Sequence, residues 1–95
     1  MKVHEIIYNQ IGGGRAFQML GASNAGYTDK SLGFRIKGCK KVNHVNITLN
    51  SMDLYDIKYI KIHGTNIKTI SESNNIYNDM LKKDIEQTTG LYLNL

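Results

Sequence analysis

Basic side chains in the middle of the chain are the clearest candidates for a chemical role. Between Lys30 and His63 the sequence holds seven lysines and arginines but only two acidic residues, which gives this segment a net charge of +5. The residues before it are neutral overall, and those after it carry −1. A concentrated positive charge favours an anionic partner. The candidate nucleic-acid-binding residues are Arg35, Lys37, Lys40, Lys41, Lys58 and Lys61.

Binding of single-stranded nucleic acid also needs aromatic side chains on which the bases stack. Tyr55 and Tyr59 are close in sequence to Lys58. The period-2 alternation of a strand, however, places these tyrosines on the opposite face from Lys58. Two interpretations therefore stay open: the basic residues form a nucleic-acid-binding surface, or they form the solvated face of a basic sheet.

The other reactive residue types do not form a catalytic or metal-binding pattern. Cys39 lies among lysines that would favour its thiolate, with His44 the nearest base in sequence, but no third residue is evident to orient that base. The histidines show no HExxH or comparable spacing. Asp53 and Asp56 flank a predicted turn, and we expect them to cap its backbone. We therefore expect a protein that is not an enzyme and has no cofactor and no metal site.

A run of glycines, Gly12–Gly14, stands before Arg15 and invites comparison with a phosphate-binding loop. Such a loop follows a strand and opens a helix, so that backbone N–H groups face the phosphate. Here the glycines are predicted to follow a helix and precede a strand, and no GK[ST] motif is present. We predict that the glycines end a helix and form a flexible connection.

The strongest structural signal is a hairpin within residues 42–64. Alternation gives each of its strands one apolar face, formed by Val45, Ile47 and Leu49 on the first and by Tyr55, Ile57 and Tyr59 on the second. These faces coincide only if odd-numbered residues pair with odd-numbered ones, so the loop has three residues (52–54) or five (50–54). The alternation breaks at Val42, Ile60 and Ile62. We therefore predict that this end of the hairpin is covered on both faces, with a terminal helix on the second.

Weaker patterns place the remaining elements around this hairpin. They predict a helix over 3–11, a strand over 15–20, a loop over 21–31, and strands over 32–37 and 66–72. Residues 73–75 offer helix N-caps for a helix over 76–88 that ends at Gly90. One side of that helix carries Ile76, Tyr77, Met80, Leu81, Asp84 and Ile85, and the tail is expected to dock through Leu91, Leu93 and Leu95.

These elements predict an α+β fold in a single domain of residues 1–95. It has an N-terminal helix, a four- or five-stranded antiparallel meander sheet, and a C-terminal helix packed on the sheet. Whether residues 15–20 join the main sheet is left open. The single cysteine excludes an intrachain disulfide, and no apolar run approaches the length of a membrane span. With no signal peptide at the N-terminus, we expect a cytoplasmic protein without membrane contact.

The stretch NITLNSMDLYDIKYIKIHGT, followed by NNIYNDMLKKDIEQTTGLYLNL, resembles a family of small uncharacterised proteins of phages, prophages and integrative conjugative elements. The resemblance covers residues 42–95, with a weaker similarity over 14–36. His63 stands where members commonly have arginine. The resemblance implies an accessory protein of a mobile element in the host cell and implies no catalytic residues.

Two functional hypotheses follow from the sequence. The first is a protein-interaction module, such as a modulator of a host or defence component, that uses an uncovered sheet face or edge strand to bind a partner or a second copy of itself. The alternative is a nucleic-acid-binding accessory protein that uses the basic residues between 35 and 61 to bind DNA or RNA.

Overall fold

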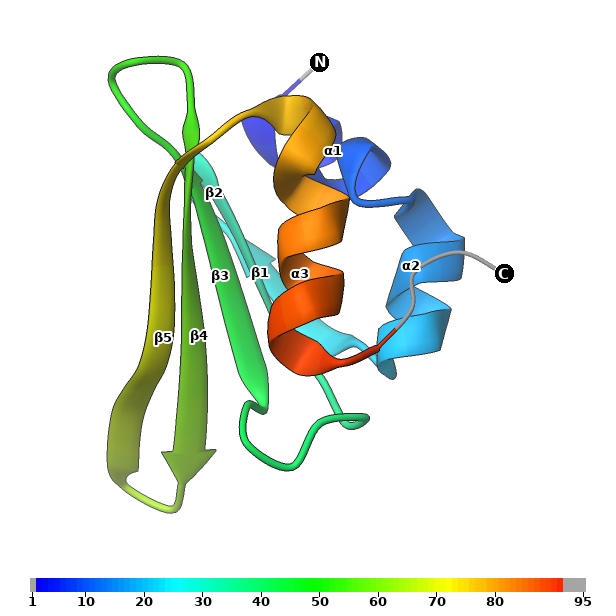
Figure 1. The fold of residues 1–95 in the computed structure, drawn as a ribbon, viewed down its shortest axis with the longest axis vertical. Coiled ribbons are helices and arrows are strands. Elements are labelled where there is room, and N and C mark those ends of the chain that lie inside the picture. Colours follow the sequence, from blue (N-terminus) through cyan, green and yellow to red (C-terminus); the bar gives the residue numbers. More distant parts are fainter. Residues whose placement is uncertain (1, 92–95) are drawn as a thin grey trace.

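The computed structural model describes residues 2–91, which form one five-stranded sheet and the helices that pack on it. The elements in chain order are α1 (Val3–Gln10), α2 (Gly13–Leu20), β1 (Ser23–Tyr27), β2 (Ser31–Arg35), β3 (His44–Leu49), β4 (Tyr55–His63), β5 (Asn66–Ile76), the 3₁₀-helix η1 (Asn78–Met80) and α3 (Leu81–Thr89). Each strand is antiparallel to the next, and the order across the sheet is the order in the chain. The helices lie together on one face of the sheet (Figure 1). The predicted α+β fold with an antiparallel meander is confirmed.

The core lies between the three α-helices and the sheet, and alternation decides which strand residues enter it. The predicted apolar face of β3 and β4 is confirmed, since Val45, Ile47, Ile57 and Tyr59 are completely buried. Burying a large apolar side chain contributes about 1.5–3 kcal/mol, so this face accounts for much of the stability. The helical side of the core consists of Ile7, Ala16, Leu20, Leu81 and Ile85, together with Ile11, the C-cap residue of α1.

The β3–β4 loop is the five-residue form, because Leu49 pairs with Tyr55. Its backbone is capped by Asn50, whose Oδ1 accepts hydrogen bonds from the N–H groups of Met52 (2.8 Å) and Leu54 (3.2 Å). The expectation that the two aspartates cap this turn is wrong for Asp56. Its Oδ1 instead accepts a hydrogen bond from the N–H of Asn75 (3.0 Å) and so ties the loop end to β5.

The N-terminal third differs from the sequence prediction in two segments. Residues 15–20 lie in helix α2, not in a strand, and therefore do not join the sheet. The glycines do end α1 as predicted, because Gly12 has a φ of +118°, but the next two glycines begin α2. The segment predicted as a loop over 21–31 contains β1, an edge strand with a register shift between Ser23 and Gly26.

The C-terminal third also begins its helix later than predicted. Residues 73–75 are not N-caps, because β5 continues through them to Ile76. Tyr77 and Met80, expected on the apolar side of the helix, are exposed, and the buried stripe consists of Leu81, Ile85 and Thr89. Gly90 ends α3 with a φ of +74°, as predicted. Leu91 packs against the core as expected, while Leu93 and Leu95 lie outside the described residues.

The far end of the β3–β4 hairpin is covered on one face only. Val42 is buried on the helix side, but Ile62 is 37% exposed on the other, so the prediction of cover on both faces is wrong. The side-chain amide of Asn43 pairs with Ile62 instead: Nδ2 donates to its C=O (2.7 Å), and Oδ1 accepts from its N–H (2.8 Å). The Asn43 side chain thereby makes the two hydrogen bonds to β4 that a backbone peptide group would make if β3 extended further.

Candidate functional site

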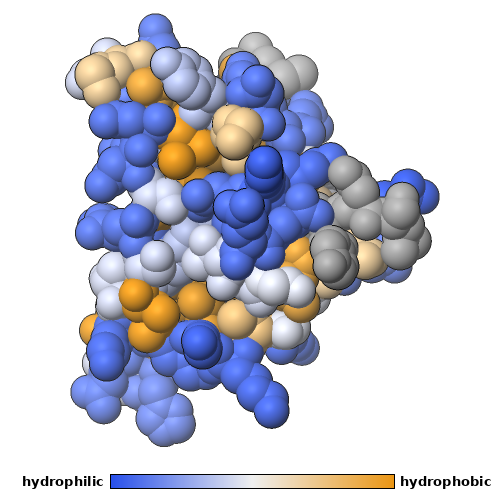
Figure 2. Space-filling view, in the orientation of Figure 1, coloured by the Kyte–Doolittle hydropathy of each residue, from blue (hydrophilic) through white to orange (hydrophobic). Residues whose placement is uncertain are grey.

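The antiparallel order of the strands gathers positive charge at one end of the sheet. Arg35 ends β2 and is the cross-strand neighbour of His44, which begins β3. Lys61 and Lys68 pair with each other just beyond this level in β4 and β5. The 36–43 connection lies at the same end (Figure 1) and adds three lysines, Lys37, Lys40 and Lys41. The lower end of the molecule, where β4 turns into β5, is accordingly hydrophilic (Figure 2).

Acidic residues lie mainly at the opposite end. Between Leu32 and Ser71 the only carboxylates of the chain belong to Asp53 and Asp56, in and beside the β3–β4 loop. Asp29, in the β1–β2 turn, lies at the same end as that loop, because Ser31 pairs with Thr48. The sheet is therefore polarised along its strands, with a basic end where an anionic ligand would be attracted.

The six candidate residues from the sequence do not form one patch. Lys58 lies on the uncovered face near the middle of the sheet, with its Nζ 4.0 Å from Oε1 of Glu72. Nζ of Lys61 donates a hydrogen bond to the carbonyl oxygen of Lys40 (3.0 Å), which ties the 36–43 connection to β4. Five of the candidates thus lie at the basic end, Arg35, Lys37, Lys40, Lys41 and Lys61, while Lys58 is paired elsewhere.

Next to Arg35 the uncovered face of the sheet is hollowed by a polar groove. One part of this groove has a volume of about 350 Å³ and is lined by Asn24, Arg35, Asn43, His44, Ile62 and Gly64. A second part of about 250 Å³ shares Asn24 and His44 and continues over Gly26, Gly33 and Asn46. Burial lowers the pKa of His44, so its imidazole is neutral at neutral pH.

Two paired glycines form the floor of this groove. Gly26 of β1 is the cross-strand neighbour of Gly33 in β2, so both strands lack a side chain at this point of the uncovered face. A Cβ atom at Gly33 would lie 3.0 Å from Oδ1 of Asn46 and 3.3 Å from Nε2 of His44. The Asn46 and His44 side chains therefore close the space above Gly33, whereas the space above Gly26 is open, because a Cβ atom there would meet nothing within 4 Å.

On the other side of β1, an aromatic cleft lies between the strand and α1. It has a volume of about 510 Å³ and is lined by His4, Glu5, Tyr8, Asn9, Phe17, Ala25, Tyr27 and Leu32. The Tyr8 and Phe17 rings meet edge to face with centroids 4.9 Å apart, and the His4 ring stacks on Tyr27 at 3.7 Å. Because β1 is an edge strand, the cleft lies beside unpaired backbone groups.

The aromatic cleft does not follow from the elements that the sequence predicts. Phe17 falls in the strand predicted over 15–20 and Tyr27 in the loop predicted over 21–31, so the sequence does not indicate that both rings line one cleft. The available signal was the spacing of Ala16 and Leu20, four residues apart, which is helical and is the pair that the structure buries.

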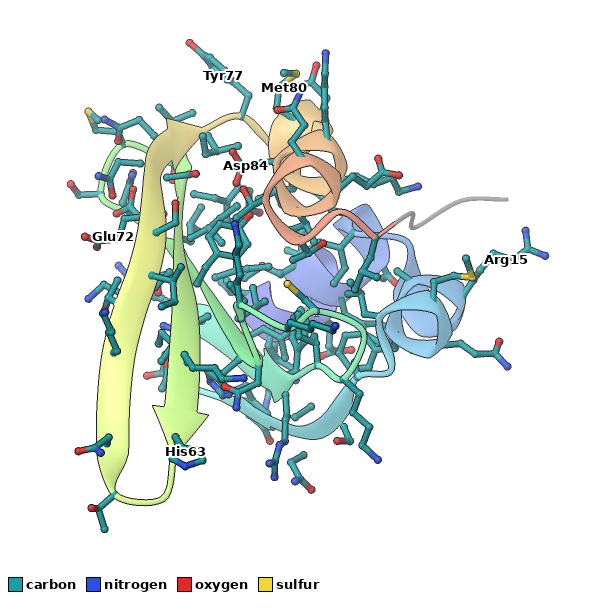
Figure 3. The ribbon with its side chains drawn as sticks, turned by 60° about the horizontal axis from the view of Figure 1, so that its bottom comes forward. Arg15, His63, Glu72, Tyr77, Met80 and Asp84 are labelled. Atoms are coloured by element: carbon teal, nitrogen blue, oxygen red, sulfur yellow. The ribbon has the colours of Figure 1, made fainter. Side chains whose placement is uncertain are left out.

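The remaining reactive groups have structural surroundings. Tyr59 is completely buried, and its hydroxyl donates a 2.5 Å hydrogen bond to Oδ2 of Asp84 in α3. Cys39 is half-buried and packs against the core. Arg15 projects outward from α2 on the helix side of the molecule (Figure 3). Within residues 2–91, no group of three or more histidine, cysteine, aspartate or glutamate residues could hold a metal ion.

The fold and these surfaces define an α+β domain with a helix-covered sheet, one open sheet face and two concave sites on either side of β1. Across the described part of the chain, no helix is long and apolar enough to span a membrane. No protein-family model, no curated protein and no solved structure matches the sequence. The resemblance to proteins of phages and integrative elements stays a prediction.

Proposed function

We propose that this protein is a non-enzymatic protein-interaction module that binds an extended peptide segment of a partner along β1. The observation that carries the proposal is the aromatic cleft beside an unpaired strand edge. An added strand would use the free N–H and C=O groups of β1, and one of its apolar side chains would enter the cleft. As an accessory protein of a mobile element, it would bind a protein of the host cytoplasm, such as a defence component.

The surroundings of the cleft favour a peptide with one large apolar anchor. Tyr8, Phe17 and Tyr27 present ring surface, and aromatic pockets of this kind supply much of the affinity of protein interfaces. β1 has only five residues and a register shift, so backbone pairing alone would be weak. Glu5 at the cleft adds a preference for a basic residue near the anchor.

The other edge of the sheet is less suited to adding a strand. β5 has eleven residues, but its register against β4 shifts twice, between Tyr55 and Ile57 and between Tyr59 and Ile60. Bulges and charged residues on an edge strand oppose pairing with another chain. Lys68 and Glu72 place such charges on β5.

A random peptide library selected on the purified protein tests the proposal. We expect the selected peptides to share a large apolar residue and to shift the amide resonances of β1 in NMR spectra. Tyr27→Ala should weaken their binding about tenfold or more, because truncating an anchor contact costs above about 1.4 kcal/mol. Tyr77→Ala is the matched control, since Tyr77 is 65% exposed and Tyr27 is 61% exposed.

If the selected peptides bind Tyr27→Ala as tightly as the unaltered protein, the cleft is not the binding site. Resonance changes confined to β5 or to the 50–54 loop would also contradict it.

A further inference from the structure

We infer that the polar groove on the uncovered face binds single-stranded nucleic acid, with one base over Gly26 beside the Asn46 and His44 side chains, and a neighbouring phosphate at Arg35. This site lies on the opposite side of β1 from the aromatic cleft, and Tyr27 lines both the groove and the cleft. The inference stands or falls independently of the function proposed above.

The shape of the groove suits a planar group. Its two parts, of about 350 and 250 Å³, are continuous through Asn24 and His44, and together they match the range of small-ligand sites, roughly 300–1,000 Å³. Gly26 leaves open space in which a flat ring can lie against the backbone, since a Cβ atom there would meet nothing within 4 Å, and the Asn46 and His44 side chains close the neighbouring space above Gly33. A base inside a duplex cannot lie there, because it is stacked between its neighbours, whereas an unpaired base can be turned out of the strand.

The groups around the floor are those that contact nucleobases. Asn24 and Asn46 carry amides that offer both a donor and an acceptor, which matches the edge of a base. His44 contributes an imidazole ring beside the floor, available for stacking or hydrogen bonding. Its lowered pKa keeps the ring neutral, so that it can both donate and accept.

The positive charge around the groove favours nucleic acid over uncharged ligands that have planar groups. Arg35 reaches the groove from β2, and the lysines of the 36–43 connection continue the positive charge along the same end of the sheet. No carboxylate lines either part of the groove. A strand with regularly spaced phosphates fits this arrangement, because its first phosphate would meet Arg35 and the following ones would approach the lysines.

Fluorescence anisotropy with labelled oligonucleotides of about ten residues, in DNA and RNA form and at several salt concentrations, tests the inference. Two variants fill the groove without changing charge. Gly26→Val is the first choice, because a Cβ atom there would meet nothing within 4 Å. Gly33→Ala is the second. We expect Gly26→Val to weaken binding about tenfold, while Thr69→Val, on the same sheet face, leaves binding unchanged.

A second pair of variants separates the phosphate contact from general positive charge. Arg35→Ala should weaken binding and lower the slope of log K against log salt by about 0.7, the value for one phosphate of a single strand. Lys30→Ala removes the same charge at the acidic end and should change neither quantity by a comparable amount. Thermal melting of each variant establishes that it is folded.

Several results would overturn the inference. These are the absence of binding to both DNA and RNA at low salt, binding to duplex that equals binding to single strands, and binding unaffected by Gly26→Val. Binding to only one of DNA and RNA supports the inference and identifies the preferred sugar. Tyr8→Ala, which removes a ring that lines the aromatic cleft and not the groove, should weaken peptide binding and still bind oligonucleotides, so failure of one proposal is distinguishable from failure of the other.

Discussion

Replacing Tyr59 with phenylalanine tests how α3 is held on the sheet. The Tyr59 side chain is completely buried in β4, and its hydroxyl donates a 2.5 Å hydrogen bond to Oδ2 of Asp84. Hydrogen bonds to charged groups contribute about 1.5–3 kcal/mol. Asp84 is only half-buried, so water can partly replace the lost donor. We therefore expect Tyr59→Phe to lower the free energy of unfolding by about 1.5–2 kcal/mol at pH 7, a fall in Tm of roughly 6–16 °C for a domain of this size.

The same substitution should change how stability depends on alkaline pH. Burial, with the hydrogen bond to Asp84 and the charge of that carboxylate, raises the pKa of Tyr59 above its ordinary value of 10. Above pH 10 the unfolded chain releases this proton while the folded chain retains it, so the free energy of unfolding falls by up to about 1.4 kcal/mol per pH unit. Below pH 10 the contribution is fully present. Tyr59→Phe should lack this part of the slope.

Urea denaturation at pH 7 and between pH 9.5 and 11 measures both effects. Tyr55, whose pKa burial also raises, contributes a slope of the same sign in both proteins, so the quantity of interest is the difference between them. Tyr77→Phe is the control, because its hydroxyl belongs to an exposed side chain. The reasoning is refuted if Tyr59→Phe is within about 0.5 kcal/mol of the unaltered protein at pH 7, or if it keeps the full alkaline slope.

Two further substitutions test side-chain contacts made with β4. Asn43→Ala removes both hydrogen bonds to the Ile62 backbone and should cost about 1–2 kcal/mol, with faster amide hydrogen exchange at Ile62; unchanged exchange there would contradict the bridging role. Lys58→Ala removes an exposed ion pair at 4.0 Å and should change stability by less than about 0.5 kcal/mol in urea denaturation, so a larger loss would mean that the pair with Glu72 matters more than its exposure indicates.

Alternation of apolar residues was sufficient to predict the central strands but not their neighbours. In β3 and β4 it identified the buried face and required an odd-length loop, because a slip of one residue would expose the whole apolar set. Residues 15–20 fit a strand and a helix equally well, since six residues contain fewer than two helical turns. Packing of Ala16 and Leu20 under the sheet decides for the helix. β1 lacks β-branched residues and is held by its pairing with β2.

The concave sites depend on register, which the sequence alone does not supply. Gly26 and Gly33 are ordinary glycines in the sequence, and they form a floor only because β1 and β2 pair them. The basic residues were visible from composition, but the separation of Lys58 from the others follows from its pairing with Glu72 across β4 and β5. The aromatic cleft requires α2 and β1 together, and both elements were missed.

The alternation of side chains along β1 constrains how this protein can evolve. Ala25 lines the cleft on one side of the strand, whereas Asn24 and Gly26 line the groove on the other. Substitutions within residues 24–26 can therefore alter either surface without the other, whereas a substitution at Tyr27 would alter both. Insertion or deletion of one residue within β1 would instead exchange the side chains presented on the two sides. Lineages that keep both surfaces should accordingly vary in length in the 28–30 turn or the 36–43 connection and conserve the length of β1.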